Sequence, residues 1–109
     1  MPNDTPLVSI IVPSRNEERF IGECLESILN QDYPKEKLEV FVVDGDSQDK
    51  TREIVKEYLV QLLDNPKQTT YTAMNIGIKN AKGDIIIKMD AHSVYAKDYI
   101  SKCVQHLEE

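Results

Sequence analysis

The sequence has few of the features that mark a secreted, membrane-spanning or nucleic-acid-binding protein. Among its 109 residues there are only two cysteines, Cys24 and Cys103, and no tryptophan. Two isolated cysteines do not make the disulfide framework of a small secreted domain, so we expect two free thiols in a reducing compartment, which indicates the cytoplasm. No apolar run approaches the roughly 20 residues that a membrane-spanning helix needs.

Positive charge is also scarce. The chain carries 13 Lys and Arg residues against 19 Asp and Glu residues, a formal net charge of -6 at pH 7. Such a chain lacks the broad basic surface that neutralises nucleic-acid phosphates, so we expect no nucleic-acid partner. A single anionic ligand can still be held locally by a metal ion or by a helix N-terminus. The length and composition fit one globular domain over residues 1–109.

Short apolar runs alternate with amphipathic segments along the chain. Three runs rich in β-branched residues predict buried strands at 7–12, 38–43 and 84–89. Apolar residues at helical spacing predict helices that begin near residues 14, 50, 70 and 97. This alternation predicts an α/β fold, a mostly parallel Rossmann-like sheet with helices on both faces.

Local signals set the expected bounds of these helices. Ser14 and Glu17 have the spacing of a capping box, so the first helix is expected to begin there with Phe20 on its apolar face. Gly83 is expected just past the end of the third helix. Around residues 59–64 two alternatives stay open: the second helix continues, or a short strand begins.

Polar segments directly follow the three predicted strands. They are the segments Pro13 to Glu17, Asp44 to Asp49, and Asp90 to His92. Ligands of parallel α/β sheets bind beyond the carboxyl ends of the strands. We therefore expect the three segments to meet at one edge of the sheet and to form one site.

Asp90 and His92 are candidate metal ligands. A carboxylate and an imidazole two residues apart in a loop can face one point, and the pair suits Mn²⁺ or Mg²⁺ when a diphosphate completes the coordination shell. The alternative is an Asp that turns the chain beside a partly exposed His, and the spacing alone leaves both interpretations open.

The other two loops hold candidate contacts for a nucleotide. The carboxylates of Asp44 and Asp46 can accept hydrogen bonds from a base or a ribose, although the segment also fits a turn in which Ser47 or Asp49 caps the next helix. In the first loop, Arg15 can contact phosphate and Glu17 can accept a hydrogen bond from a nucleoside.

Together these segments resemble a known family. The stretches VSIIVPSRNEE, EVFVVDGDSQDKT and NIGIKNAKGDIIIKMDAH occur in this order and are similar to the opening of a glycosyltransferase family 2 domain with the GT-A fold. The ending DAH and the spelling VDGDSQD resemble the branch that makes bacterial exopolysaccharides of the succinoglycan type. The resemblance implies a nucleotide-sugar donor, with a UDP-sugar favoured, and a divalent metal.

The resemblance also assigns roles to the first loop and to one helix. It implies that Pro13, Arg15 and Glu17 contact the nucleotide. Asn75 lies in the family's helix before the metal-binding strand, and the resemblance implies that it supports the site from there.

The second and third loops depart from the family's usual pattern. Asp44 matches the first Asp of a strand-end pair that contacts the base, whereas Gly45 stands in place of the second Asp and Asp46 in place of a Gly. The resemblance favours Asp44 as the base contact. Asp90 matches the first Asp of the family's Asp-x-Asp motif, and His92 replaces the last one, so weaker metal binding without substrate is expected.

The family's catalytic Asp lies downstream of this motif, in the acceptor-binding half, and nothing after His92 matches it. We therefore expect a truncated domain, the donor-binding half of an inverting glycosyltransferase whose catalytic base lies beyond residue 109. The implied acceptor is a saccharide or a lipid-linked saccharide, and the full-length protein would act in the cytoplasm or at the cytoplasmic face of the membrane. The fragment is expected to bind nucleotide weakly, to transfer sugar negligibly and to be prone to self-association.

Two other functions stay open at this point. The segment from Asp44 to Ser47 loosely resembles the Asp-x-Asp-x-Thr nucleophile motif of haloacid-dehalogenase-type phosphatases, although that motif usually follows the first strand. A non-catalytic module that binds a nucleotide sugar would also fit the sequence.

Overall fold

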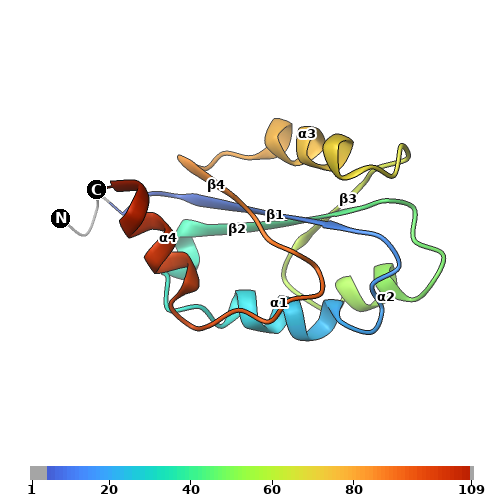
Figure 1. Cartoon of the computed structure of the whole chain (residues 1–109), viewed down its shortest axis with the longest axis horizontal. Helices are drawn as coiled ribbons and strands as arrows, with labels where there is room; N and C mark the ends of the chain where they lie inside the picture. Colours follow the sequence, from blue (N-terminus) through green and yellow to red (C-terminus); the bar gives the residue numbers. More distant parts are fainter. Residues whose placement is uncertain (1–4, 109) are drawn as a thin grey trace.

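The computed structural model describes residues 5–108 of the chain. Four strands form a sheet in the order β3-β2-β1-β4, and every neighbouring pair is parallel. Helix α3 covers one face of the sheet and α1, α2 and α4 lie on the other (Figure 1). The α/β fold with helices on both faces is therefore confirmed. No helix in this part of the chain is long and apolar enough to cross a membrane.

Strands and helices alternate along the chain. The strands are β1 Val8–Ser14, β2 Leu38–Asp44, β3 Gln61–Asp64 and β4 Ile85–Lys88. The helices are α1 Ile21–Leu29, α2 Thr51–Val55, α3 Thr70–Asn80 and α4 Tyr99–Glu108, with a short 3₁₀ turn η2 at Lys35–Lys37.

The central strand β1 is buried on both faces. Val8, Ile10 and Val12 belong to the core on the side of α1, α2 and α4. Between them, Ile11 points to the other face and packs with Ala73 of α3. Full burial of an aliphatic side chain contributes about 1.5–3 kcal/mol to the stability of the fold. Strand β1 therefore stabilises both layers, and its packing between them determines where its carboxyl end lies.

The expected capping box at Ser14 and Glu17 is wrong. Ser14 is the last residue of β1, and its hydroxyl donates to Asp44 Oδ1 at 3.1 Å instead of capping a helix. The peptide N–H of Glu17 donates to Thr51 Oγ1 at 2.8 Å. Helix α1 begins only at Ile21 and has no side-chain cap. Contacts to the neighbouring loop thus replace the local cap and keep this segment outside the helix.

Between Val55 and Asp64 the alternative with a strand is confirmed. Helix α2 ends at Val55, and β3 pairs with β2 so that Leu62 lies opposite Val42. Strand pairing therefore overrides the helical spacing of the sequence. Helical spacing in the sequence also predicts that three apolar side chains point inward, namely Phe20, Leu59 and Leu107. All three are exposed in the structure.

Gly83 does not act as the expected helix cap. The residue that caps α3 is Ala81 in an extended conformation, and no glycine between residues 5 and 108 has a positive φ. A Cβ on Gly83 would instead lie 2.5 Å from Ser9 Oγ and 2.7 Å from the Ser9 backbone nitrogen. Glycine is required here because the chain passes very close to β1.

Replacing Gly83 with alanine should lower the free energy of unfolding by about 1–3 kcal/mol, the usual cost of forcing atoms into a closely packed position. The Ser9 backbone cannot move aside easily, because β1 is paired on both sides. Urea unfolding followed by circular dichroism measures the change. Lys82→Ala is the control, since the Lys82 side chain is exposed, and equal stability of both variants would contradict the expectation.

Candidate functional site

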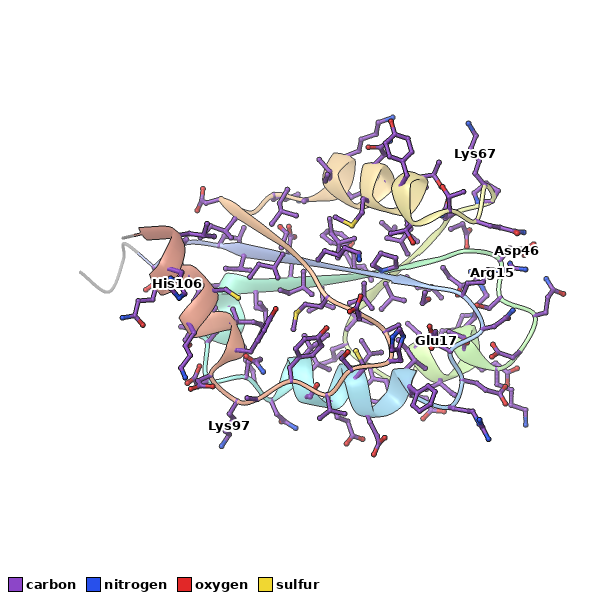
Figure 2. The ribbon with its side chains drawn as sticks, in the orientation of Figure 1. Arg15, Glu17, Asp46, Lys67, Lys97 and His106 are labelled. Carbon is purple, nitrogen blue, oxygen red and sulfur yellow. The ribbon has the colours of Figure 1, made fainter. Side chains whose placement is uncertain are left out.

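The three polar loops meet at the carboxyl edge of the sheet, as the sequence predicts. Arg15 Nη1 donates to the carbonyl oxygen of Gly45 at 2.6 Å, which joins the first loop to the second. His92 Nδ1 lies 3.3 Å from Glu17 Oε2, which joins the third loop to the first. Figure 2 shows Arg15, Glu17 and Asp46 close together at one end of the elongated molecule.

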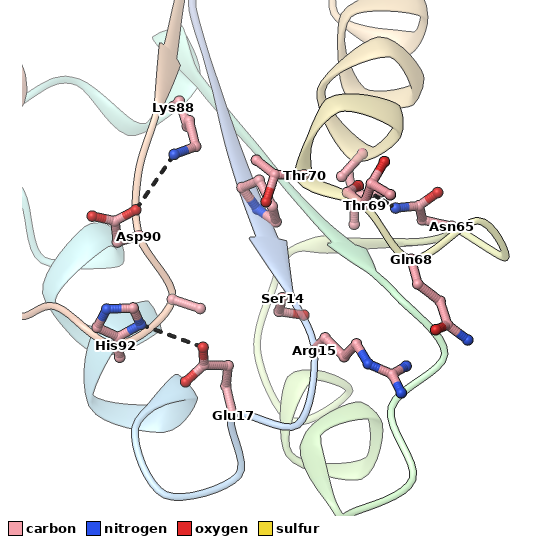
Figure 3. A pocket seen from close by; sticks show the side chains of 14 residues that line it. Ser14, Arg15, Glu17, Asn65, Gln68, Thr69, Thr70, Lys88, Asp90 and His92 are labelled. Carbon is pink, nitrogen blue, oxygen red and sulfur yellow. Dashed lines mark hydrogen bonds and ion pairs between the residues drawn. The ribbon is translucent and has the colours of Figure 1, made fainter.

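A cavity of about 210 Å³ opens between these loops (Figure 3). One wall comes from the first and third loops and the other from the segment that follows β3. The lining residues are Pro13, Ser14, Arg15, Glu17, Val43, Asn65, Gln68, Thr69, Thr70, Ala73, Lys88, Asp90, Ala91 and His92. Typical small-molecule sites measure about 300–1,000 Å³, so these residues would enclose a nucleotide sugar only in part.

The residues predicted for nucleotide or metal binding divide into two groups. Those that line the cavity are Pro13, Arg15, Glu17, Asp90 and His92. Those that do not are Asp44, Asp46 and Asn75, of which the last two are exposed. The first and third loops therefore line the cavity, whereas Asp44 and Asp46 line an adjoining hollow of about 490 Å³, and their contact with a nucleotide stays a prediction.

Asp44 is fully buried at the end of β2. Its Oδ1 accepts hydrogen bonds from the hydroxyls of Ser14 at 3.1 Å and Ser47 at 2.6 Å. Its Oδ2 accepts from the Ser47 backbone N–H at 2.9 Å and from Arg52 Nη1 at 3.2 Å. A carboxylate has about four lone-pair sites, and all are used here. Asp44 thus ties both loops to α2, and its contact with a base stays a prediction.

Gly45 departs from the family pattern for a structural reason. A Cβ at this position would lie 3.3 Å from the Cα of Gln68 and 3.5 Å from the carbonyl oxygen of Ser14. The segment after β3 therefore lies close against this position, and a Cβ there would require the backbone of Gln68 to shift by a few tenths of an ångström.

The loops at this edge contain unusual backbone conformations. Three non-glycine residues between residues 5 and 108 have a positive φ, and they are Asn16 (54°), Asp46 (60°) and Gln68 (68°). Such conformations are costly for most residues and are retained where the surrounding contacts enforce them, often at binding sites. Gln68 lines the cavity and Asn16 lies between the lining residues Arg15 and Glu17, whereas Asp46 lies in the second loop, which does not line it.

Asp90 and His92 remain accessible for a ligand. Their side chains are 56% and 60% exposed. Lys88 Nζ lies 3.6 Å from Asp90 Oδ1 and partly balances its charge. The Nδ1 atom of His92 faces Glu17 Oε2, and within residues 5–108 no hydrogen bond engages Nε2, as in many metal-binding histidines.

The two metal-binding side chains of this loop, Asp90 and His92, would hold a divalent cation only if a bound phosphate or water also coordinates it. A carboxylate and an imidazole suit Mn²⁺ well and Mg²⁺ less well. Among the residues that the structure describes, no three or more His, Cys, Asp or Glu side chains gather closely enough to hold a metal. Phosphate oxygens and water would therefore have to complete the coordination shell.

Two side chains form hydrogen bonds with the backbone of Asp90. Its N–H donates to Tyr95 Oη at 2.6 Å, and its carbonyl oxygen accepts from Cys24 Sγ at 3.2 Å. Burial raises the pKa of both groups, that of the Cys24 thiol to about 11. Both therefore stay protonated near neutral pH and fix the peptide that presents Asp90. Cys24 and Cys103 are both free thiols, as expected.

Alkylation should distinguish the two thiols. Only the thiolate reacts, and burial keeps Cys24 neutral below about pH 11, whereas Cys103 is partly exposed on α4. At pH 8 we expect iodoacetamide to add one label per folded chain, at Cys103, and two labels in denaturant, as counted by mass spectrometry. Labelling of Cys24 in the folded chain at the rate of Cys103 would contradict this description of the loop.

One whole wall of the cavity was not predicted from the sequence, namely Asn65, Gln68, Thr69 and Thr70 of the segment after β3. Lys88 at the end of β4 was not predicted either. A signal was present, because a strand at residues 61–64 places Asn65 at the carboxyl edge by the same rule that located the other loops. Because residues 61–64 fit the end of a helix as well as a short strand, their pattern alone does not place this wall.

A larger hollow lies away from these loops. It measures about 780 Å³ and is lined by apolar and charged side chains around Leu29, Leu38 and Tyr58. It lies where β2 and β3 begin, at the opposite edge from the cavity. Ligands of parallel α/β sheets bind at the carboxyl edge, so the smaller cavity is the candidate site.

Comparison with known proteins relates the chain to glycosyltransferases. The chain is 40% identical over 105 residues to a dolichyl N-acetyl-alpha-D-glucosaminyl phosphate 3-beta-D-2,3-diacetamido-2,3-dideoxy-beta-D-glucuronosyltransferase of Methanococcus voltae, covering 90% of this chain and 33% of that protein. It superposes with a TM-score of 0.90 and 34% identity on the mannosyltransferase PcManGT of Pyrobaculum calidifontis in complex with GDP-Man and Mn²⁺, covering 95% of this chain and 33% of that one.

A second solved structure is that of Staphylococcus aureus TarS residues 1–349 in complex with UDP, with a TM-score of 0.82 and 29% identity, covering 93% of this chain and 32% of that one. The chain thus spans about a third of the length of these relatives. The expected GT-A type of fold is confirmed by these superpositions. A profile of the family described as "Glycosyl transferase family 2" matches residues 9–109. The chain belongs to glycosyl transferase family 2.

Proposed function

We propose that this chain is the donor-binding half of a glycosyltransferase and that it binds a nucleoside-diphosphate sugar, with a UDP-sugar favoured. The main support is the convergence of the first loop, the third loop and the segment after β3 on one cavity at the carboxyl edge of the sheet. The solved relatives that contain GDP-Man with Mn²⁺ and UDP are consistent with such a ligand.

Two cationic side chains of the cavity suit the diphosphate. Arg15 already donates to the carbonyl oxygens of Gly45 and Asp46, which holds its guanidinium at the cavity rim. Lys88 lies beside Asp90 and can donate to a phosphate oxygen when that carboxylate is engaged by a cation. These two residues would orient the donor and balance the charge of its phosphates.

Asp90 and His92 would hold Mn²⁺ or Mg²⁺. The cation supplies charge neutralisation to the diphosphate that leaves in a glycosyl transfer. Glu17 fixes the ring of His92, while Tyr95 and Cys24 fix the peptide of Asp90. Because these contacts already exist, little reorganisation is needed to present the two side chains to a cation.

The remaining roles belong to the whole protein. We propose an inverting transfer to a saccharide or lipid-linked acceptor, with the catalytic base outside residues 1–109 and this segment as the nucleotide-sugar-binding part of the domain. We further propose an exopolysaccharide product of the succinoglycan type and a location in the cytoplasm or at the cytoplasmic face of the membrane. Asp44, Asp46 and Asn75 remain proposed contributors, although they do not line the cavity.

A phosphatase of the haloacid-dehalogenase type has little support. Its nucleophile would be Asp44, and a nucleophile must reach the phosphorus atom of its substrate. Asp44 is fully buried and accepts four hydrogen bonds. A non-catalytic nucleotide-sugar module shares the donor site, and no feature of the cavity favours it over a transferase.

Titration with UDP and GDP, with and without Mn²⁺, tests the proposed function. We expect weak binding that strengthens with Mn²⁺, and NMR shift changes concentrated at residues 13–17, 65–73 and 88–92. Inorganic phosphate with Mn²⁺ is the control, because it provides charge without a nucleoside. No binding of either nucleotide, or shifts centred on the hollow around Tyr58, would contradict the proposal.

A further inference from the structure

The segment at residues 89–98 connects β4 to α4 and carries both candidate metal ligands. It consists of turns and irregular backbone and runs along α1 (Figure 1). Three side chains in α1 or just past its end form hydrogen bonds with backbone groups of this segment, and they are Cys24, Ser27 and Gln31. The position of the candidate metal ligands therefore depends on α1 as well as on the sheet.

Ser27 holds the middle of the segment. Its Oγ accepts a hydrogen bond from the backbone N–H of Tyr95 at 3.0 Å. Its own hydroxyl hydrogen goes to the carbonyl oxygen of Cys24 at 2.7 Å, a bond that serine often forms within a helix. Because a hydroxyl has a single hydrogen, Ser27 must present its oxygen to the loop as an acceptor. The helix thus fixes both the place and the orientation of the group that holds Tyr95.

Tyr95 extends this constraint to Asp90. Its Oη accepts from the Asp90 N–H at 2.6 Å, while Cys24 Sγ donates to the Asp90 carbonyl oxygen at 3.2 Å. These two groups belong to the peptide units on either side of the Asp90 Cα. With both units held, the direction in which the Asp90 side chain leaves the backbone is set. The ring of Tyr95 packs against that of Tyr99, with centroids 4.9 Å apart, which limits its movement.

Gln31 holds the other end of the segment. Its side chain is buried, and Nε2 donates to the carbonyl oxygens of Ser27 at 3.1 Å and Ala96 at 2.6 Å. Its Oε1 accepts from the Ile100 N–H at 2.9 Å. Ile100 lies in the first turn of α4, where a backbone N–H has no partner within its own helix. Gln31 therefore determines where α4 begins, and Ser27 acts on the half of the segment that contains Asp90.

We propose that Ser27 is a positioning residue for the candidate metal site and that, acting through Tyr95, it holds Asp90 in place before a cation or a nucleotide binds. This role rests on the proposed function, in which Asp90 is a metal ligand. Groups that support metal ligands directly contribute about 10–100-fold to metal affinity. Ser27 acts through one further residue, so we expect an effect of about three- to tenfold, the usual contribution of one hydrogen bond.

Amide hydrogen exchange of the ligand-free chain, followed by NMR, tests the position of the loop without a nucleotide. In the unchanged chain we expect the Asp90 and Tyr95 amides to exchange at least about tenfold more slowly than in an unfolded chain. Ser27→Ala should raise both rates about three- to tenfold and leave the amides of β1 unchanged. Unprotected amides in the unchanged chain, equal rates in the variant, or an equal rise throughout β1 would overturn the positioning role, whatever the cavity binds.

UDP affinities with and without Mn²⁺ test the consequence for the site. Ser27→Ala should weaken binding with Mn²⁺ about three- to tenfold and leave metal-free binding unchanged, because Ser27 does not line the cavity. Ser101→Ala is the matched control, since the Ser101 hydroxyl donates to Asp32 Oδ1 and likewise links α4 to the segment after α1. This control should keep full Mn²⁺ dependence. Equal losses with and without Mn²⁺, or no loss with Mn²⁺, would overturn the proposal.

Two further outcomes separate this role from the proposed function. No binding of UDP by the unchanged chain would overturn the proposed function and this role together, whereas normal Mn²⁺-dependent binding by Ser27→Ala would overturn this role alone. If Ser27→Ala does not fold, Tyr95→Phe takes its place, because it removes the hydroxyl that accepts from the Asp90 N–H. We expect it to lose about tenfold in affinity with Mn²⁺ only. Unchanged Mn²⁺ dependence in Tyr95→Phe would overturn the proposal.

Discussion

Replacing Asp90 with asparagine should abolish the Mn²⁺-dependent part of UDP and GDP binding and weaken affinity at least about tenfold, since even residues that only support metal ligands contribute about 10–100-fold. The substitution keeps the size of the side chain and removes its negative charge. Isothermal titration with and without Mn²⁺ measures the effect. Binding that does not depend on the metal should persist, because Arg15 and Lys88 still line the cavity.

Two controls separate metal binding from general damage to the loop. Asp98→Asn changes a carboxylate outside the cavity whose partner is Lys102 at 3.1 Å, so Mn²⁺ dependence should be retained. Removing Mn²⁺ from the unchanged chain with EDTA should reproduce the Asp90→Asn affinity. Full Mn²⁺ dependence in Asp90→Asn would contradict the assignment of Asp90 as a ligand.

Replacing Asp44 with alanine should destabilise the fold by about 3 kcal/mol or more, the cost of breaking a buried charge network. The substitution leaves the Ser47 backbone N–H and the Ser14 and Ser47 hydroxyls without their acceptor. Arg52 loses one partner and keeps its contact with Asp64 at 2.7 Å. Chemical unfolding at pH 7, followed by circular dichroism, gives the change in free energy.

Glu53→Ala is the matched control for this stability effect. Glu53 is an exposed carboxylate on α2, next to Arg52, so its loss should change stability by no more than about 0.5 kcal/mol. Similar stabilities of the two variants would show that burial of the Asp44 carboxylate contributes little to the fold.

Much of the fold could be predicted because it depends on local patterns. The runs that form β1, β2 and β4 are rich in β-branched residues, and burial on both faces of a parallel sheet requires such runs. Once the strands are placed, the carboxyl-edge rule brings Arg15, Glu17, Asp90 and His92 to one cavity without further information. The parts of the site that directly follow a clear strand were therefore within reach of the sequence.

Other features depend on contacts between distant segments. Ser14 has the spacing of a helix cap, but its hydroxyl bonds to Asp44, 30 residues away. A pattern within one segment carries no information about that competition. For the same reason the sequence does not reveal that Asp44 is saturated by hydrogen bonds, or that Gly45 faces the backbone of Gln68. Asn65 was missed because its strand, β3, has only four residues and resembles the end of a helix.

Paramagnetic broadening by Mn²⁺ is the most direct test of a single metal and diphosphate site at the carboxyl edge. With UDP present, we expect the NMR signals of residues 88–92 and 13–17 to broaden at low Mn²⁺ concentrations, followed by those of residues 65–70. Signals around Leu29, Leu38 and Tyr58, at the opposite edge, should stay sharp. Broadening centred on that opposite edge, or broadening at Asp90 that leaves residues 13–17 unaffected, would contradict a shared site.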